Sequence, residues 1–179
     1  QIPVGVAPYS VILKGNKAFV TNWGGRQPVP GDLTHNSSGS LAVIDSKTGI
    51  ASSGTVSVID LEKQRTITEI HVHLHPCGMA LSPDKRLLYI ANSNSDIISV
   101  IDTETDEVIR NISSKPMDEL PFGSTPNDLV VSPDGKTLYV ANGGDNLIAV
   151  INLSDYRLKG LIPAGWYPGA VDISKDGNT

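Results

Sequence analysis

The sequence predicts an all-β protein in which one unit of four strands recurs along the chain. Of its 179 residues, 16 are Val, 17 are Ile and 11 are Thr, and such β-branched residues suit pleated strands better than helices. Another 17 Gly and 12 Pro indicate frequent turns. The third observation is an internal repeat, because the sequence SPDKRLLYIAN at 82–92 returns as SPDGKTLYVAN at 132–142.

Three markers define the repeated unit. A proline opens each copy, an asparagine ends the strand-like segment that follows, and a Val-Ile-Asp or Val-Ile-Asn triplet comes next. The spacing between Pro126 and Pro168 gives an undecorated unit of 42 residues. Because a four-stranded propeller blade takes roughly 40 to 45 residues, the repeat predicts a β-propeller of four-stranded antiparallel blades. The markers are Pro8, Pro76, Pro126 and Pro168, together with Asn22, Asn92 and Asn142.

The blades follow one another in chain order. Alternating apolar residues and turn formers place the strands of the second blade at 79–82, 87–92, 97–102 and 107–113. The chain holds an incomplete set of about three and a half blades. The expected segments are blade 1 at about 7–72 with an inserted loop at 23–54, blade 2 at about 75–114, blade 3 at about 125–163 and the start of blade 4 at about 168–179.

The turn between the first two strands of a blade has the sequence Ser-Pro-Asp-Gly. Pro sets φ at the second position, and Gly adopts a left-handed conformation at little cost. Gly135 and Gly177 occupy the last position, whereas Lys85 takes it in the second blade. We therefore predict that Lys85 has a positive φ and carries about 1 kcal/mol of strain.

Two insertions lengthen loops that a meander of strands places on the same face. One is the inserted loop at 23–54, and the other lies around 115–121, before Pro126. Repeat proteins usually carry insertions on the face that binds, so we expect this face to be functional, although neutral drift of loop length is the alternative. The sequence LAVID at 41–45 copies VSVID at 56–60 and allows an extra strand or hairpin, while the tip at 35–40 favours flexibility.

Charge and hydropathy exclude several classes of partner. The net charge is −5 and no cluster of Lys or Arg occurs, so we expect no nucleic-acid binding. The apolar runs are too short for a transmembrane segment. Cys77 is the single cysteine, which excludes a disulfide within the chain.

Three alternating histidines, His71, His73 and His75, could converge on a metal ion from one strand face. The residues between them are Val72 and Leu74, so the histidines are equally typical of the polar side of an outer strand. Other copies of this segment carry no histidine. We expect no metal site and no cofactor.

Residues beside the repeated prolines should lie near the propeller axis on the insertion face, and Trp23 and Arg26 begin the longer insertion. Together they offer aromatic rings, an imidazole and a carboxylate, which suit a small polar ligand, a glycan or a protein partner. The alternative is that these side chains pack between blades and bind turn backbone. Cys77 beside His75 could suggest a thiol nucleophile, but a buried free cysteine is the simpler interpretation, and we expect no catalytic residue. The candidate ligand-binding residues are His75, Cys77, Asn127, Asp128, Trp166, Tyr167, Trp23 and Arg26.

The repeated segments resemble the YVTN-repeat β-propeller family, which is WD40-like. The resemblance lies in Phe19-Val-Thr-Asn22, Leu88-Tyr-Ile-Ala-Asn92 and Leu138-Tyr-Val-Ala-Asn142. The sequences TNWGGR at 21–26 and GLIPAGWYP at 160–168 are similar to the propeller portion of bacterial bifunctional proteins that also carry a phosphoesterase domain of the alkaline-phosphatase superfamily. This resemblance implies a seven-bladed propeller, completed by the same or another chain, in a periplasmic, extracellular or cell-surface protein.

The expected function follows from the repeat and the resemblance together. We expect a non-catalytic binding or scaffold region that accompanies a phosphoesterase domain outside this sequence. One alternative is an enzyme that uses the propeller channel, lactonase-like or cofactor-dependent. The other is a surface-layer or adhesion repeat.

Overall fold

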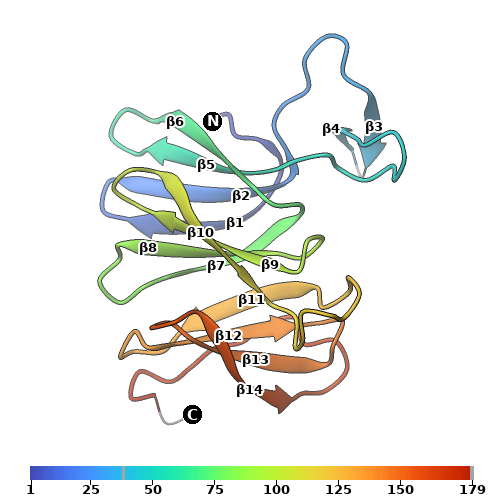
Figure 1. Cartoon of the computed structure of the whole chain (residues 1–179). Coiled ribbons are helices and arrows are strands. Elements are labelled where there is room, and N and C mark those ends of the chain that lie inside the picture. The colour runs from blue at the N-terminus through green and yellow to red at the C-terminus, as the bar shows by residue number, and fades with distance from the viewer. Residues whose placement is uncertain (38, 178–179) are drawn as a thin grey trace. The chain divides into compact units, whose positions relative to one another are not determined.

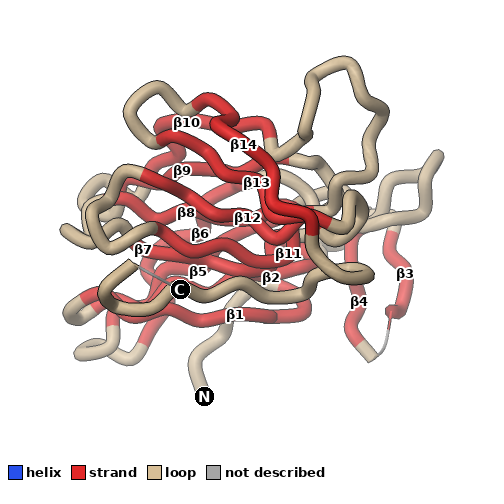
Figure 2. The backbone as a smooth tube through the Cα atoms, turned by 90° about the horizontal axis from the view of Figure 1, so that it is seen from below, coloured by secondary structure: helices blue, strands red, loops and turns tan. Residues whose placement is uncertain are grey.

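The computed structural model describes residues 1–37 and 39–177, and this part of the chain is all-β (Figure 2). The chain divides into two compact units, Gln1–Cys77 and Gly78–Thr179. The described residues form no helix, and therefore none that is long and apolar enough to cross a membrane.

The first unit contains one four-stranded antiparallel sheet in the order β1-β2-β5-β6. A separate pair, β3 with β4, lies in the inserted loop beside this sheet (Figure 1). The expected extra hairpin is thus confirmed, while Ser38 at its tip lies outside the described residues. The strands are β1 (Val6–Lys14), β2 (Lys17–Gly25), β3 (Thr34–Ser37), β4 (Ser40–Val43), β5 (Gly54–Asp60) and β6 (Arg65–Val72).

The second unit contains two further four-stranded antiparallel sheets, ordered β10-β9-β8-β7 and β11-β12-β13-β14. The first strand, β7, begins in the last two residues of the first unit. The predicted four-stranded antiparallel blades are therefore confirmed, and we call the three sheets blades 1, 2 and 3. The strands are β7 (Pro76–Leu81), β8 (Leu87–Asn92), β9 (Ile97–Asp102), β10 (Glu107–Ser113), β11 (Pro126–Val131), β12 (Thr137–Asn142), β13 (Leu147–Asn152) and β14 (Arg157–Pro163).

Three strands of blade 2 have the bounds that the sequence predicts, but β7 starts and ends earlier than 79–82. Ser82 explains the earlier end, because it belongs to the turn. Its N–H donates to the carbonyl oxygen of Leu87 at 2.8 Å, and its Oγ accepts the Leu87 N–H at 3.0 Å.

Residues with a left-handed backbone conformation occur at every kind of turn in the blades. Lys85 has φ 60°, as predicted, at the position where Gly135 has φ 72°. All other non-glycine residues with positive φ lie at equivalent turns, so the conformation is a property of the repeat. They are Asp96 and Asn146 between second and third strands, Gln64, Asp106 and Tyr156 between third and fourth strands, and Ala7, His75, Thr125 and Tyr167 directly before the repeated prolines.

Residues 168–177 form no strand, although the repeat places the first strand of another blade there. A strand requires a ladder partner, and no described strand pairs with this segment. It is held instead by two contacts to β11: Asn127 Nδ2 donates to the carbonyl oxygen of Pro168 at 3.3 Å, and the Val171 N–H donates to Asp128 Oδ2 at 3.2 Å. Residues 178 and 179 lie outside the described residues.

Blades 2 and 3 share one apolar core within the second unit. We name the two surfaces that meet in it the Tyr89 face of blade 2 and the Leu138 face of blade 3. Every side chain in these two faces is at most 8% exposed. The Tyr89 face consists of Ala80, Tyr89, Ala91, Ile98, Val100 and Ile112, and the Leu138 face consists of Leu129, Val131, Leu138, Val140, Ala149 and Ile151.

Candidate ligand-binding site

Three aromatic side chains form a continuous stack in the first unit. The rings of Tyr9 and Trp23 lie 4.3 Å apart between centroids with an interplanar angle of 21°. The rings of Trp23 and His75 are also 4.3 Å apart, at 26°. Both neighbouring rings therefore stack nearly parallel to the indole, and aromatic pairs of this kind add to the energy of burial.

The repeat explains why these residues meet. Tyr9 follows Pro8 on β1, Trp23 follows Asn22 on β2, and His75 precedes Pro76 at the entry to β7. The buried Asn22 fixes the end of β2, because its Nδ2 donates to Thr55 Oγ1 at 3.0 Å on the neighbouring strand. The stack thus stands where β1 begins and β2 ends.

His75 owes its position to a left-handed backbone with φ 57°. A following proline disfavours the right-handed helical region, and the left-handed alternative costs roughly 1–2 kcal/mol for a non-glycine residue. The same conformation occurs before Pro8, Pro126 and Pro168. It is therefore an architectural turn that the histidine shares, not strain reserved for a reaction.

The solvent exposure of the side chains decreases from Tyr9 to the other two members of the stack. Tyr9 is 55% exposed, whereas Trp23 and His75 are half-buried. Burial lowers the pKa of His75, so the imidazole is neutral at pH 7. The indole Nε1 of Trp23 is buried and makes no hydrogen bond to any described residue, which costs about 1–3 kcal/mol. The exposed ring of Tyr9 therefore lies on two half-buried rings, Trp23 and His75, that carry no charge. This arrangement suits a ligand that has an apolar surface.

Cys77 lies beside this stack but is only 3% exposed. Its Sγ is 3.7 Å from Nδ1 of His75 and 3.3 Å from the carbonyl oxygen of the same residue. A nucleophilic thiol must be reachable by substrate as well as close to a base. The burial of Cys77 closes that route, so the pair is structural.

The second unit contains the equivalent three positions with different residues. Asn127 follows Pro126, Gly143 follows Asn142, and Tyr167 precedes Pro168. A Cβ on Gly143 would lie 2.4 Å from Asn127 Nδ2 and 3.0 Å from Tyr167 Cζ, so these two side chains fill the place that Trp23 fills in blade 1. The repeat therefore builds the same three-position frame in blades 1 and 3.

The remaining predicted residues do not join the stack. Asp128 accepts the N–H of Val171, Trp166 is 92% exposed, and Arg26 donates to Asp32 from both terminal nitrogens at 2.7 and 2.8 Å. Hydrogen bonds from Arg26 lower the pKa of Asp32 to about 2, so this ion pair persists at neutral and mildly acidic pH. Its role is to shape the start of the inserted loop.

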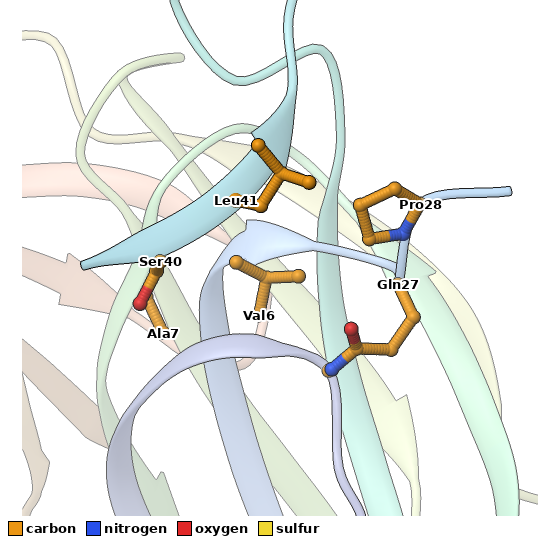
Figure 3. Close-up of a pocket in the computed structure, with 7 residues that line it drawn as sticks. Val6, Ala7, Gln27, Pro28, Ser40 and Leu41 are labelled. Atoms are coloured by element: carbon orange, nitrogen blue, oxygen red, sulfur yellow. The ribbon is translucent and has the colours of Figure 1, made fainter. Parts of the chain in front are cut away.

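That loop also borders a pocket of about 350 Å³ against β1 (Figure 3). Leu41 of β4 and Val6 of β1 face this pocket, and Gln27 Nε2 donates to the carbonyl oxygen of Val4 at 3.0 Å beside it. None of the described residues that line it carries a charged side chain. The lining residues are Gly5, Val6, Ala7, Gln27, Pro28, Ser40 and Leu41.

Sequence reasoning missed the residues that hold the left-handed entry turns in place. Asp96, which is 2% exposed, accepts the N–H groups of Gly123 at 2.8 Å and Thr125 at 2.9 Å. Asn146 Oδ1 accepts the N–H of Tyr167 at 2.9 Å. Both stand four positions after a repeated asparagine, and this shared spacing is the signal that could have revealed them.

The alternating histidines do not gather around a common point. Within the described residues, no group of three or more His, Cys, Asp or Glu side chains could hold a metal ion. His71 is exposed and pairs with Thr55 across the strands, while the ring of His75 stacks on Trp23.

Comparison with known proteins supports the fold. No family model matches the chain, and no curated protein sequence matches it. Among solved structures, hydrazine synthase of Kuenenia stuttgartiensis is similar over 96% of this chain, with 27% identity and a TM-score of 0.68. The dihydro-heme d1 dehydrogenase NirN, solved in complex with DHE, is similar over 62% of this chain, with 23% identity and a TM-score of 0.51.

Both neighbours are β-propeller proteins, and both are named as enzymes. This chain is accordingly an incomplete set of β-propeller blades. It spans 40% of the hydrazine synthase chain and 22% of the NirN chain.

Proposed function

We propose that the chain is the ligand-binding region of a β-propeller protein, and that the stack of Tyr9, Trp23 and His75 binds the ring of a carbohydrate. The observation that supports this most is the open face of Tyr9, which is 55% exposed at the end of the stack. An exposed tyrosine in a three-ring stack is held rigid, so little side-chain entropy is lost on binding.

The chemistry of the stack favours a neutral ring over a charged one. A sugar ring presents C–H groups on its faces, which pack on an aromatic face, and hydroxyls at its edge, which stay hydrated or bind polar groups. His75 is neutral at pH 7 because burial lowers its pKa, so the stack offers no charge to an anion.

Calorimetric titration with maltotetraose, cellotetraose and triacetylchitotriose tests this function. We expect at least one sugar to bind, and we expect Tyr9→Ala to weaken binding about tenfold, the loss of one stacking contact. Tyr9→Phe keeps the ring and should bind like the parent protein. Trp166→Ala, which removes an aromatic outside the stack, is the matched control. Failure of all three sugars, or equal binding by Tyr9→Ala, would contradict the proposal.

For the whole protein we propose membership of the YVTN-repeat group, location in the periplasm, outside the cell or on its surface, and a scaffold role for the propeller beside a phosphoesterase domain. The repeated Tyr-Val-Ala-Asn and Tyr-Ile-Ala-Asn strands support the first point. Fractionation of the host cell with an antibody against this region tests the location. Recovery in the cytoplasm alone would contradict it.

A further inference from the structure

A pocket of about 350 Å³ also lies within the second unit, where the turns of blades 2 and 3 meet. Leu87 of β8 and Leu153, which follows β13, line this pocket and pack against the apolar core that the two blades share. The β7–β8 and β11–β12 turns touch beside them, because a Cβ on Gly135 would lie 3.6 Å from Pro83 Cδ. The pocket is therefore the place where the shared core reaches these turns, and we name it the Tyr89 pocket.

Tyr89 brings an unpaired hydroxyl to this pocket. The residue is 2% exposed, lines the pocket and forms no hydrogen bond with a described residue. Burial, and then the charges of Tyr156 and Asp84, raise the pKa of Tyr89 to about 12. Because Tyr156 and Asp84 also line the pocket, the hydroxyl end of Tyr89 faces into it. A buried polar group without a partner is unfavourable, so a ligand that binds this hydroxyl supplies what the chain does not.

Packing of the core does not require this hydroxyl. Tyr89 lies three residues before the repeated Asn92, and the equivalent position of blade 1 holds Phe19, which is 0% exposed. A phenyl ring thus fills the same position of a blade completely. The hydroxyl of Tyr89 is an addition that the packing of the repeat leaves unexplained.

Two carboxylates, Asp84 and Asp134, occupy the same place in the two turns. Oδ1 of each accepts the hydroxyl of the serine two residues earlier, at 2.5 and 2.6 Å, and the N–H two residues later, at 3.0 Å. These hydrogen bonds, the one from the serine most of all, hold the pKa of both carboxyls below its usual range, so both are ionised at pH 7. They also fix the orientation of each carboxylate and leave Oδ2 for a ligand. Lys136 Nζ, at 3.9 Å from Asp134 Oδ2, is beyond hydrogen-bond distance.

This set of groups matches the chemistry of an alkylammonium ion. Such an ion carries three N–H donors, and the Tyr89 hydroxyl and the two carboxylates offer three acceptors. Leu87 and Leu153 provide apolar surface for the alkyl chain. Tyr156 is held in place beside the pocket by Arg110, whose Cζ lies 4.5 Å from the centroid of the ring.

We propose that the Tyr89 pocket binds the head group of a primary alkylammonium ligand, with the ammonium on Tyr89, Asp84 and Asp134 and the alkyl chain on Leu87 and Leu153. The site is separate from the aromatic stack of the first unit and does not depend on it. Its volume is at the lower end of the roughly 300–1,000 Å³ typical of ligand pockets, which suits a short chain. The net charge of −5 favours the approach of a cation. Free diamines and the lysine side chain of a partner share this chemistry.

Two-dimensional amide NMR of the whole chain tests the proposal by titration with 1,5-diaminopentane and with Nα-acetyl-lysine methylamide. The Gly135 N–H lies at the pocket, where it donates to the carbonyl oxygen of Ser132 at 2.8 Å, and its signal should shift on binding. Tyr89→Phe and Asp84→Asn should each weaken binding about tenfold, the loss of one hydrogen bond to a charged group. A diamine that binds more tightly identifies a free amine as the ligand, and equal binding by the blocked lysine identifies a lysine side chain; both results support the proposal.

The controls separate this site from general attraction of cations and from misfolding. Asp45→Asn removes one negative charge from a turn of the first unit, where Asp45 accepts the N–H groups of Lys47 and Thr48, and should bind like the parent protein. Dispersed amide signals confirm the fold of Tyr89→Phe, which the chain tolerates at Phe19. Pentan-1-ol, which lacks the charge, should not bind. Failure of both amines to shift Gly135, equal binding by Tyr89→Phe, or equal losses in Asp45→Asn and Asp84→Asn would each overturn the proposal.

Discussion

Blades 1 and 3 contain the same three-position frame and make opposite use of it. In blade 1 the frame holds Tyr9, Trp23 and His75 as a stack that ends in an exposed ring. In blade 3 the central residue is Gly143, and the side chains of Asn127 and Tyr167 close over it. The backbone is common to both because it comes from the repeat. The chemistry differs because one central position carries an indole and the other carries no side chain.

The largest expected effect comes from removing the central ring of blade 1. Trp23→Ala leaves a cavity between Tyr9 and His75 and should lower the free energy of unfolding by about 3 kcal/mol, the lower end for a buried tryptophan because Trp23 is only half-buried. Urea denaturation measures this loss. Trp166→Ala, at a 92% exposed position, should change stability by less than about 0.5 kcal/mol. Equal effects of the two substitutions would show that the stack carries no packing energy.

The next effect concerns the residues that hold the frame. Asp96→Ala deprives the Gly123 and Thr125 N–H groups of a buried carboxylate, so we expect a loss of about 2–3 kcal/mol. Asn146→Ala removes one neutral acceptor from the N–H of Tyr167 and should cost about 1 kcal/mol. Thermal and urea unfolding compare the two. An Asn146 variant that is the less stable of the pair would contradict this ranking.

A smaller effect is expected from filling the frame of blade 3. Gly143→Ala pushes a methyl group against the ends of Asn127 and Tyr167, and both side chains can shift. We expect a loss of about 1–2 kcal/mol, together with greater exposure of Tyr167 in chemical modification by tetranitromethane. An unchanged stability and reactivity would mean that these side chains do not close over Gly143.

The smallest effect has the opposite sign. Lys85 has φ 60° where other blades have glycine, so Lys85→Gly should relieve left-handed strain and raise stability by about 1 kcal/mol, less the entropy that glycine adds to the unfolded chain. Gly135→Lys at the matching turn should lower it by a similar amount. If both substitutions act in the same direction, the turn does not carry the assumed strain.

The sequence was sufficient to predict the blades but not the arrangement of residues in the candidate site. Strands 87–92, 97–102 and 107–113 follow from a repeat with fixed spacing and from turn residues, because both are local. The positive φ of Lys85 follows in the same way. The stack could not be predicted as a set, because Tyr9 and His75 are far apart in sequence. Only the pairing of β1 with β2 and the position of the turn before β7 bring them to Trp23. Asp128 forms a hydrogen bond with Val171, and Arg26 forms an ion pair with Asp32. No spacing rule in the sequence predicts these two contacts.

Fluorescence of a Trp166→Phe protein tests most directly whether ligand binds on the stack. Trp23 is then the sole tryptophan, and it lies directly beneath the exposed Tyr9 ring. We predict that the sugar identified by calorimetry shifts or quenches the emission of Trp23, with the same Kd as the calorimetric titration and with loss of the signal in Tyr9→Ala. Saturating binding by calorimetry with unchanged Trp23 emission would place the ligand elsewhere and contradict the account.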